Sequence, residues 1–223
     1  MQTEADARIR SFKLRRGRVT PGQQRALDTL WHRYGVEWAP GALPEPAELF
    51  GRTAPLVLEV GFGMGETTAA MAAADPGRDV LAVDVHTPGV GALLAEVGRR
   101  GLGNVRVATG DGVDLLRALP PASLDELRVF FPDPWPKARH HKRRLVDAGF
   151  VALAAERLAA GGRLHVATDW EPYAEQVLEV VGADERFAVE GWTPRPAHRP
   201  VTRFERQGLA KGHRVRDVVG VRR

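Results

Sequence analysis

Short apolar runs alternate with longer segments of mixed polarity from Pro55 to the end of the chain. We expect the runs rich in Val, Leu and Ala to be buried strands and the segments between them to be helices. The predicted strands span residues 56–60, 79–83, 105–109, 124–131, 163–168, 187–192 and 214–221. The predicted helices span residues 66–74, 90–100, 113–119, 143–160 and 172–181. This alternation is typical of βαβ units and predicts a mostly parallel, seven-stranded α/β sheet with helices on both faces.

The segments around this alternation differ in character. Residues 1–25 lack a sustained apolar period and are predicted to form a flexible basic arm, and a helix over 23–34 is predicted to pack on the domain. Gly161 and Gly162 are predicted to end the fourth helix of the alternating part and to open the fifth strand. A long loop is predicted between the last two strands. Residues 26–223 are then expected to form a single domain.

The composition narrows the class of protein. The chain has 223 residues, enough for one large domain, and no cysteine, which rules out a disulfide framework and a thiolate zinc site. Its first ten residues contain acids and no apolar core of a signal peptide, and no segment approaches the roughly 18 apolar residues of a membrane span. The sequence therefore predicts a cytoplasmic protein.

Charge is distributed unevenly along the chain. Residues 1–25 carry seven Lys or Arg against two acids, and residues 193–223 carry nine against two, whereas the part between them is acidic. Five Lys or Arg and two His also fall within the eight residues 137–144. Basic tails alone fit a solvated surface, but three basic segments on an acidic body favour a polyanionic partner bound at one face.

Three alternating glycines, Gly61, Gly63 and Gly65, follow the first predicted strand within LEVGFGMGE. Glycine lets a ligand approach the main chain closely, and a strand, glycine loop and helix in that order are typical of a nucleotide cradle. Glu59 stands just ahead of the loop, where it would oppose a pyrophosphate and favour the cationic sulfonium and ammonium of S-adenosylmethionine. The pattern favours S-adenosylmethionine over NAD, although a glycine loop alone also fits a tight turn.

Two further acids end the next two predicted strands. Asp84 follows the glycines at the distance, about 20 residues, at which a carboxylate binds ribose hydroxyls. Asp111 follows the third strand, where it would reach the adenine amine, and it fits equally well the N-cap of the next helix. Since parallel strands end at one edge, Glu59, Asp84 and Asp111 are predicted to face one crevice.

The stretch VFFPDPWPKARHHKRR ends the fourth predicted strand. Prolines on both sides of Asp133 fix φ and remove amide donors, so we expect this acid in a stiff, extended loop at the same edge. Trp135 is predicted to offer a stacking surface for a base, and the cations after it to bind phosphates. A plain Pro-Asp-Pro turn is the structural alternative.

These residues resemble a known family, the bacterial tRNA (guanine-N7-)-methyltransferases. The motifs that carry the resemblance are Arg10-Ser11-Phe12 with Arg15-Arg16-Gly17-Arg18, LEVGFGMGE, VHTPGVG, FFPDPWPKARHHKRR, ATDWEPYAE and RPVTRFE. The resemblance implies a Rossmann-like class I methyltransferase fold and S-adenosyl-L-methionine as the methyl donor, with no metal. It also implies an enzyme that methylates N7 of guanine(46), in the variable loop of tRNA.

The resemblance also implies roles for individual residues, with Asp133 as the catalytic position. The residues implied to bind the cofactor are Glu59, Gly61, Gly63, Gly65, Asp84, Asp111 and Asp133. The residues implied to contact the substrate are Lys137, Asp169, Thr202, Arg203, Phe204 and Glu205. The residues implied to contact RNA are Arg139, His140, His141, Lys142, Arg143 and Arg144. The chain differs from the usual pattern at Asp84, where many members have Glu, and at Arg203, where Lys is common.

The chemistry of the implied reaction restricts the role of Asp133. Guanine N7 is an acceptor with an in-plane lone pair and carries no proton at neutral pH. It can attack a sulfonium methyl directly, so the reaction needs alignment rather than a general base. We therefore expect Asp133 to position a guanine N–H or the cofactor ammonium. Asp169 also fits the N-cap of the helix predicted to begin near Trp170.

Two other functions fit parts of the sequence. A methyltransferase acting on an exocyclic amine has a similar acidic proline loop, but there two prolines usually follow the acid, and here Trp135 intervenes. A non-enzymatic RNA-binding protein on a decayed methyltransferase fold is disfavoured by the intact glycines and acids. The pair His140 and His141 has no cysteine partner at metal-ligand spacing, which favours RNA contact or exposure. The predicted partner is tRNA, no membrane is expected, and both a monomer and a homodimer fit the sequence.

Overall fold

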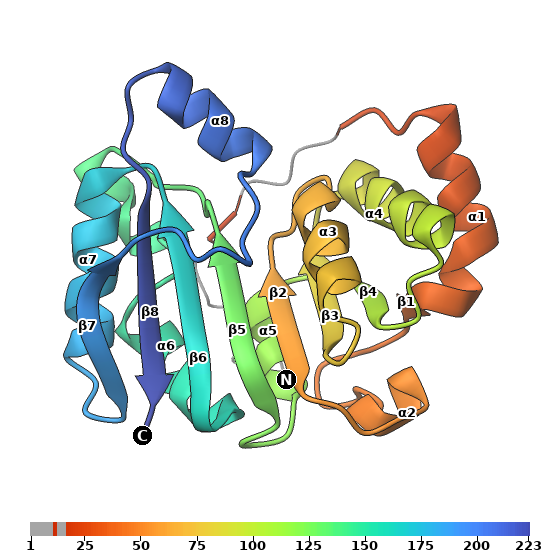
Figure 1. The fold of residues 1–223 in the computed structure, drawn as a ribbon, viewed down its shortest axis with the longest axis horizontal. Coiled ribbons are helices and arrows are strands. Elements are labelled where there is room, and N and C mark those ends of the chain that lie inside the picture. Colours follow the sequence, from red (N-terminus) through yellow and green to blue (C-terminus); the bar gives the residue numbers. More distant parts are fainter. Residues whose placement is uncertain (1–10, 13–16) are drawn as a thin grey trace, which may run out of the picture.

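The computed structural model describes residues 11–12 and 17–223, and only the backbone of Arg203. Its centre is an eight-stranded sheet in the order β1-β4-β3-β2-β5-β6-β8-β7 (Figure 1). The strands are β1 Gly35–Val36, β2 Leu56–Val60, β3 Asp79–Asp84, β4 Val105–Thr109, β5 Leu124–Phe130, β6 Leu158–Thr168, β7 Phe187–Thr193 and β8 Arg216–Arg222. All paired neighbours are parallel except β8, which is antiparallel to β6 and to β7. The seven predicted strands are confirmed, and the two-residue β1 adds an eighth at the edge.

Helices cover both faces of the sheet (Figure 1). The helices are α1 Pro21–Tyr34, α2 Pro46–Phe50, α3 Glu66–Ala74, α4 Thr87–Arg100, α5 Gly112–Ala118, the 3-10 helix η2 Ala138–Arg143, α6 Ala148–Arg157, α7 Glu171–Gly182 and α8 Arg203–Ala210. Buried residues of α1, α3 and α4 share one apolar cluster, and those of α5, α6 and α7 share another. The sheet lies between these two layers.

The strand β2 shows why its sequence is continuously apolar. Leu58 belongs to the cluster on the α5 side, whereas its neighbour Val57 belongs to the cluster on the α3 side. Successive residues of a strand point to opposite faces, so a strand buried on both faces needs apolar residues at nearly every position. Glu59 interrupts this run and points to the same face as Val57.

The predicted fourth helix over residues 143–160 is wrong at both ends. The cationic run forms the separate η2, and α6 begins only after Asp147, whose carboxylate accepts a hydrogen bond from Phe150 N at 2.8 Å. The helix ends at Arg157, before the two glycines. Leu124 pairs with Leu158 but Glu126 pairs with Arg163, so β6 bulges between these pairs. Gly161 lies in this bulge with φ at 81°, in the left-handed region that favours glycine.

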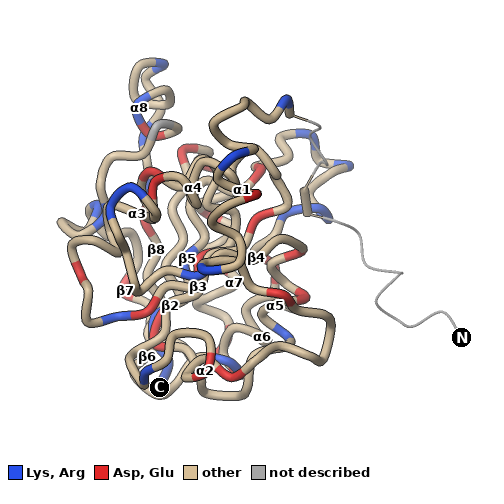
Figure 2. Tube along the Cα trace, turned by 90° about the vertical axis from the view of Figure 1, so that its right-hand side faces the viewer, with Lys and Arg blue, Asp and Glu red and all other residues tan. Residues whose placement is uncertain are grey.

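The predicted loop between the last two strands contains α8. Thr202 Oγ1 accepts from Glu205 N at 3.0 Å, and Glu205 Oε2 accepts from Thr202 N at 3.4 Å. This reciprocal arrangement is a capping box, which starts the helix. In both views α8 projects from the body at the end opposite α2 (Figures 1 and 2).

The amino-terminal part of the chain is described in two pieces. The helix α1 begins at Pro21, two residues before the predicted start, after a capping box between Thr20 and Gln23. Residues 1–10 and 13–16 of the predicted arm lie outside the described residues. In the part that is described, no helix has both the length and the apolar character that crossing a membrane requires.

Candidate active site

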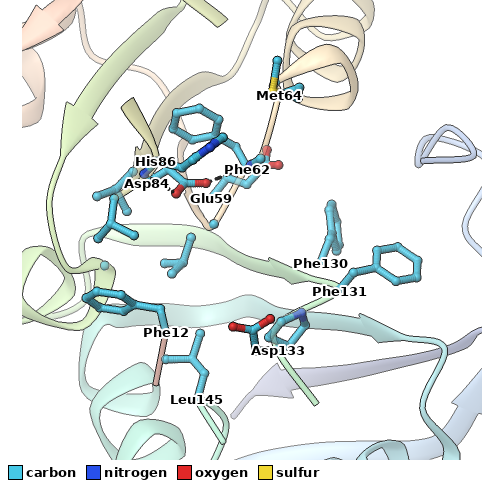
Figure 3. A pocket seen from close by; sticks show the side chains of 18 of the residues that line it. Phe12, Glu59, Phe62, Met64, Asp84, His86, Phe130, Phe131, Asp133 and Leu145 are labelled. Carbon is cyan, nitrogen blue, oxygen red and sulfur yellow. Dashed lines mark hydrogen bonds between the residues drawn. The ribbon is translucent and has the colours of Figure 1, made fainter. Parts of the chain in front are cut away.

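A pocket of about 500 Å³ opens at the carboxyl ends of β2, β3, β4 and β5. Ligands of parallel α/β sheets bind at this edge, and the volume is in the range of small-molecule sites. The predicted cofactor residues that line it are Glu59, Gly61, Gly63, Gly65, Asp84, Asp111 and Asp133. In Figure 3, Glu59 and Asp84 lie close together, and Asp133 lies across the pocket from them. Residues separated by more than 70 positions in the sequence thus face one cavity.

The glycine loop and the helix packed against it need glycine for different physical reasons. Gly61, Gly63 and Gly65 have φ values of 78°, 62° and 75°, which side chains rarely adopt. The loop is also pressed by α4, because a Cβ on Gly89 would lie 1.9 Å from the carbonyl oxygen of Gly63. The main chain of this loop is therefore held against the pocket, with α3 beginning directly after Gly65.

Backbone amides hold two of the acids. Asp84 Oδ2 accepts from Gly63 N and Asp84 Oδ1 from His86 N, both at 2.9 Å. Burial raises the pKa of Asp84 in spite of these hydrogen bonds. Asp111 Oδ1 accepts from Val113 N at 2.9 Å and caps α5, and the same residue lines the pocket. For Asp111 the capping position and the pocket position are therefore compatible.

Glu59 is a buried carboxylate with an unsatisfied oxygen. Its Oε1 accepts from the Thr68 hydroxyl at 3.0 Å, while Oε2 has no hydrogen-bond partner among the described residues. Burial raises the pKa of Glu59, and the positive charge of Arg128 only partly opposes this shift. A buried polar atom without a partner is rare and costly, which indicates a site completed by a ligand.

The Asp133 loop is strained at both ends. Phe131 has φ at 53° and Trp135 has φ at 45°, both in the left-handed region and neither of them glycine. Phe131 N donates to Ala167 O at 2.7 Å, which ties the start of the loop to β6. Asp133 is half-buried between these two positions. The loop is thus stiff, as predicted, but its direction is set by two strained residues as well as by the prolines.

Trp135 does not offer the stacking surface that the sequence predicts. Its side chain is only 6% exposed, and its Nε1 donates to Ser11 O at 2.9 Å. The guanidinium of Arg143 lies over its ring at 5.0 Å, and the ring of His140 meets it edge-on. Trp135 therefore joins η2 and the segment at Ser11 to the Asp133 loop.

The predicted substrate residues fall into two groups, those that line the pocket and those that do not. Thr202 and Phe204 line the pocket, and Phe204 is 55% exposed. Glu205 is buried and accepts from Arg199 Nη1 at 2.6 Å. The remaining two whose side chains are described, Lys137 and Asp169, lie outside the pocket lining; Lys137 is exposed, and Asp169 Oδ2 lies 3.0 Å from His213 Nδ1. Asp169 does not cap α7, which begins after Trp170 without a side-chain cap.

The basic run is also divided by the fold. Arg139, His141 and Lys142 are exposed on η2, as a phosphate-binding surface requires. Arg144 is only 4% exposed; it donates to Pro134 O at 3.0 Å and to Gln176 Oε1 at 2.6 Å. These contacts join the Asp133 loop to α7, so the buried Arg144 is not part of the exposed basic surface.

Several residues of the site were not singled out from the sequence. Further pocket-lining residues are Ser11, Phe12, Phe62, Met64, His86, Phe130, Phe131, Leu145 and Gln207. Ser11 and Phe12 belong to one of the quoted motifs, which was a usable signal. Arg199 also belongs to a quoted motif, RPVTRFE, but its complete burial was not predicted, because an arginine in a basic segment is expected at the surface.

One group of possible metal ligands lies away from the pocket. Ligand atoms of Glu126, His165 and His198 lie within 4.8 Å of one another. However, Glu126 accepts from Arg128 Nε at 2.8 Å and from Arg78 Nη1 at 2.7 Å, so its carboxylate already pairs with two cations. These guanidiniums oppose a metal ion at this place.

Comparison with known proteins gives the family. A family model described as "Putative methyltransferase" matches residues 53–218. A tRNA (guanine-N(7)-)-methyltransferase of Streptomyces avermitilis is 58% identical over 219 residues, which cover 96% of this chain and 75% of that protein. The enzyme of the same name from Nitrosospira multiformis is 55% identical over 214 residues, 95% of this chain and 93% of that protein.

Solved structures share the fold at low sequence identity. The 16S rRNA methyltransferase KamB aligns with a TM-score of 0.59 at 15% identity, over 84% of this chain and 98% of that one. A geranyl diphosphate methyltransferase in complex with GPP and sinefungin aligns with a TM-score of 0.53 at 14% identity, over 93% and 96%. At such identities the likeness shows the fold alone, and it confirms the predicted class I methyltransferase architecture.

Proposed function

The chain belongs to the tRNA (guanine-N(7)-)-methyltransferase family, and we propose on this premise that its pocket binds S-adenosyl-L-methionine and directs the methyl group to guanine(46) of tRNA. The enzyme is an S-adenosylmethionine-dependent tRNA (guanine-N7-)-methyltransferase. The finer statements, on the nucleotide and on the task of each residue, are proposals that rest on the geometry of the pocket.

The unsatisfied Glu59 Oε2 is the observation that carries the cofactor assignment. A buried carboxylate oxygen beside a glycine loop suits a cationic ligand and opposes an anionic one. S-adenosylmethionine carries an ammonium and a sulfonium and no phosphate, so it fits this site better than a dinucleotide does. We assign the ribose hydroxyls to Asp84 and the adenine edge to Asp111, because both line the pocket where the neighbouring strands β3 and β4 end.

The reaction requires alignment of two groups rather than proton transfer. When bound, the cofactor would supply a sulfonium methyl group whose carbon a nitrogen lone pair can attack directly, with the N–C bond forming as the C–S bond breaks and the neutral thioether leaving. Guanine N7 has such a lone pair and no proton to lose. Asp133 therefore acts as an aligning acceptor for a guanine N–H or for the cofactor ammonium, from a loop fixed at Phe131 and Trp135.

We place the guanine between the Asp133 loop and α8. Thr202 and Phe204 line this side of the pocket, and the exposed ring of Phe204 is a flat surface on which a base can stack. Exposed Lys137 is suited to a flanking phosphate. For Asp169 and Arg203, a contact with the substrate rests on the resemblance alone. Glu205 acts on the substrate through the start of α8, because its carboxylate is bound inside the protein.

The exposed cations of η2 are proposed to bind the tRNA backbone. Arg139, His141 and Lys142 present their side chains to solvent, and His140 and Arg143 pack on Trp135 at the edge of this surface. A base whose N7 is engaged in tertiary pairing has to leave its stack to react, so contacts to neighbouring phosphates hold the tRNA while the guanine enters the pocket.

The proposed function is tested by locating the methylated nucleotide in the tRNA product. Unmodified tRNA is incubated with the protein and methyl-labelled S-adenosylmethionine, and the product is cleaved at 7-methylguanine, which weakens the chain at that nucleotide. We expect label at one variable-loop guanine and cleavage there. Label on an exocyclic amine would replace this function with the alternative methyltransferase, and cleavage at another nucleotide would overturn the assignment to guanine(46).

A further inference from the structure

Arg199 is a fully buried cation in the segment that joins β7 to α8. Its guanidinium donates to both carboxylate oxygens of Asp217, from Nε and Nη2, each at 2.8 Å. Asp217 lies on β8 and its Oδ1 is 2.7 Å from His165 Nε2 on β6. The guanidinium is thereby fixed to two strands of the sheet.

The same guanidinium holds the start of α8. Arg199 Nη1 donates to Glu205 Oε2 at 2.6 Å, and this oxygen also accepts from Thr202 N at 3.4 Å in the capping box. Thr202 and the neighbouring Phe204 line the pocket. The position of this substrate-side wall therefore depends on an ion pair inside the protein.

Arg199 also contacts the opposite wall. Its guanidinium lies over the rings of Phe130 and Phe131, at 5.6 and 5.8 Å from their centroids. Both rings line the pocket where β5 ends, directly before the loop that carries Asp133. In Figure 3 the two phenylalanines lie beside Asp133, and Figure 1 shows the segment between β7 and α8 passing in front of β6 and β5.

We propose that Arg199 is a positioning residue that sets the distance between the two walls of the active site, the Asp133 loop and the start of α8. This inference rests on the proposed function, since it assumes that the guanine lies between those walls. Planar guanidinium geometry suits the task, because one group makes the bidentate bond, the second ion pair and the ring contacts together. Misplacement of reacting groups by about 1 Å can slow a reaction about 10²-fold.

The first test is Arg199→Lys, which keeps the charge and loses the planar fork. We expect kcat to fall about 10- to 100-fold, with the dissociation constant for S-adenosylmethionine within about twofold of wild type. The matched control is Arg52→Lys. Arg52 donates from Nε and Nη2 to the buried Asp79 at the start of β3, the opposite edge of the sheet, and its replacement is expected to leave kcat unchanged. Unchanged kcat in Arg199→Lys, or equal losses in both variants, would overturn the proposal.

A double-mutant cycle separates positioning from direct contact. Glu205→Gln removes the ion pair with Arg199 and keeps an oxygen for Thr202 N. If Arg199 acts through Glu205, the two changes share one effect, and the double variant is about as active as the weaker single variant. Multiplied losses would mean that Glu205 contacts the guanine independently, which contradicts the inference.

Hydrogen exchange gives a readout that does not need activity. In Arg199→Lys we expect faster exchange of the α8 amides and unchanged exchange in β2 and β3. Unchanged exchange in α8 would overturn the positioning role even if turnover fell. If the wild-type protein made no 7-methylguanine, the proposed function would fail by itself, while the exchange measurement would still decide whether Arg199 holds α8.

Discussion

The sheet face on the α3 side has two halves that treat buried charge in opposite ways. Over β2, β3 and β4 the face is covered by apolar helices, and the acids Glu59 and Asp84 are held by a hydroxyl and by backbone amides. Over β5, β6 and β8 it is covered by the segment before α8, and the acids Glu126 and Asp217 pair with guanidiniums. Burial raises the pKa of the first two acids, whereas hydrogen bonds and cations lower the pKa of the second two despite burial.

The two halves therefore differ in where a cation comes from. Over β2, β3 and β4 a buried carboxylate has no cationic partner at hydrogen-bond distance in the described part of the chain, whereas over β5, β6 and β8 the carboxylates pair with arginines of the protein. On the proposed function, the half over β2, β3 and β4 (the cofactor half) leaves Glu59 Oε2 without a partner among the described residues until the cationic cofactor binds. The half over β5, β6 and β8 (the substrate half) pairs its carboxylates with buried arginines. These ion pairs fix α8 and the end of β5 relative to the sheet. Buried ion pairs contribute little net stability compared with apolar packing, so their value here is geometric.

Asp133 lies where the halves meet, and its replacement has the largest expected effect on turnover. Asp133→Ala should lower kcat at least about 10²-fold while leaving tRNA affinity nearly unchanged, because alignment is lost and the phosphate contacts are not. Asp133→Asn, which keeps an acceptor oxygen, should retain much more activity than Asp133→Ala. Single-turnover rates would show this; equal losses in both variants would indicate that the negative charge, rather than an acceptor, is required.

The sequence predicted the placement of the acids and glycines in the cofactor half well, because the determinants of that placement are local. Glu59 and the glycines lie within one strand-to-helix connection, and Asp84 reaches Gly63 only 21 positions away. Strand ends in a parallel sheet share an edge, so the sequence alone places consecutive acids in one crevice. The predicted helix 66–74 matches α3 at both ends for the same reason.

The substrate half was poorly predicted because its determinants are distant in sequence. His165 meets Asp217 across 52 positions, and Arg144 meets Gln176 across 32, so neither partner is visible from its own segment. Burial of Arg144, Glu205 and Arg199 follows from these contacts and not from residue type. The helix α8 was missed although Thr202 and Glu205 form a capping-box pattern, since this eight-residue segment is mostly polar and contains few apolar residues to suggest a buried helix.

The next largest expected effect is on the free energy of unfolding, and it concerns Glu126 in the substrate half. Glu126 has its pKa lowered to about 2 by Arg128 and Arg78 in spite of burial. A lowered folded-state pKa stabilises the fold above the unfolded-state value near 4.5, and this stabilisation is lost as pH falls towards about 2. Glu126→Gln should therefore lower the free energy of unfolding at pH 7 by about 3 kcal/mol. Denaturant melts from pH 7 to pH 3 should show the difference from wild type shrinking with acid; a constant difference would contradict it.

Glu59→Gln should behave in the opposite way. Its raised pKa means that the ligand-free fold is most stable below the unfolded-state pKa of the carboxyl and loses stability as pH rises through the folded-state value. The neutral variant should fold at least as well as wild type but bind S-adenosylmethionine about tenfold more weakly at pH 7.5. Wild-type affinity should increase with pH and the variant's should not. Calorimetric titration at several pH values checks this, and identical pH profiles would remove Glu59 from cofactor binding.

The smallest expected effect concerns the basic residues 137–144. Replacing the exposed residues should weaken tRNA binding, whereas replacing the buried Arg144 should lower the stability of the fold. Replacing both Arg139 and Lys142 by Ala should weaken tRNA binding several-fold and reduce the slope of log affinity against log salt by about one per lost phosphate contact, with unchanged thermal stability. Arg144→Ala should leave the slope unchanged and lower the free energy of unfolding by about 1–3 kcal/mol, because it leaves Gln176 and Pro134 without their donor. Filter binding over a range of salt, paired with thermal melts, distinguishes the two effects. A flattened slope in Arg144→Ala would show that Arg144 contacts a tRNA phosphate. Arg144 would then have to leave Pro134 and Gln176 when the tRNA binds.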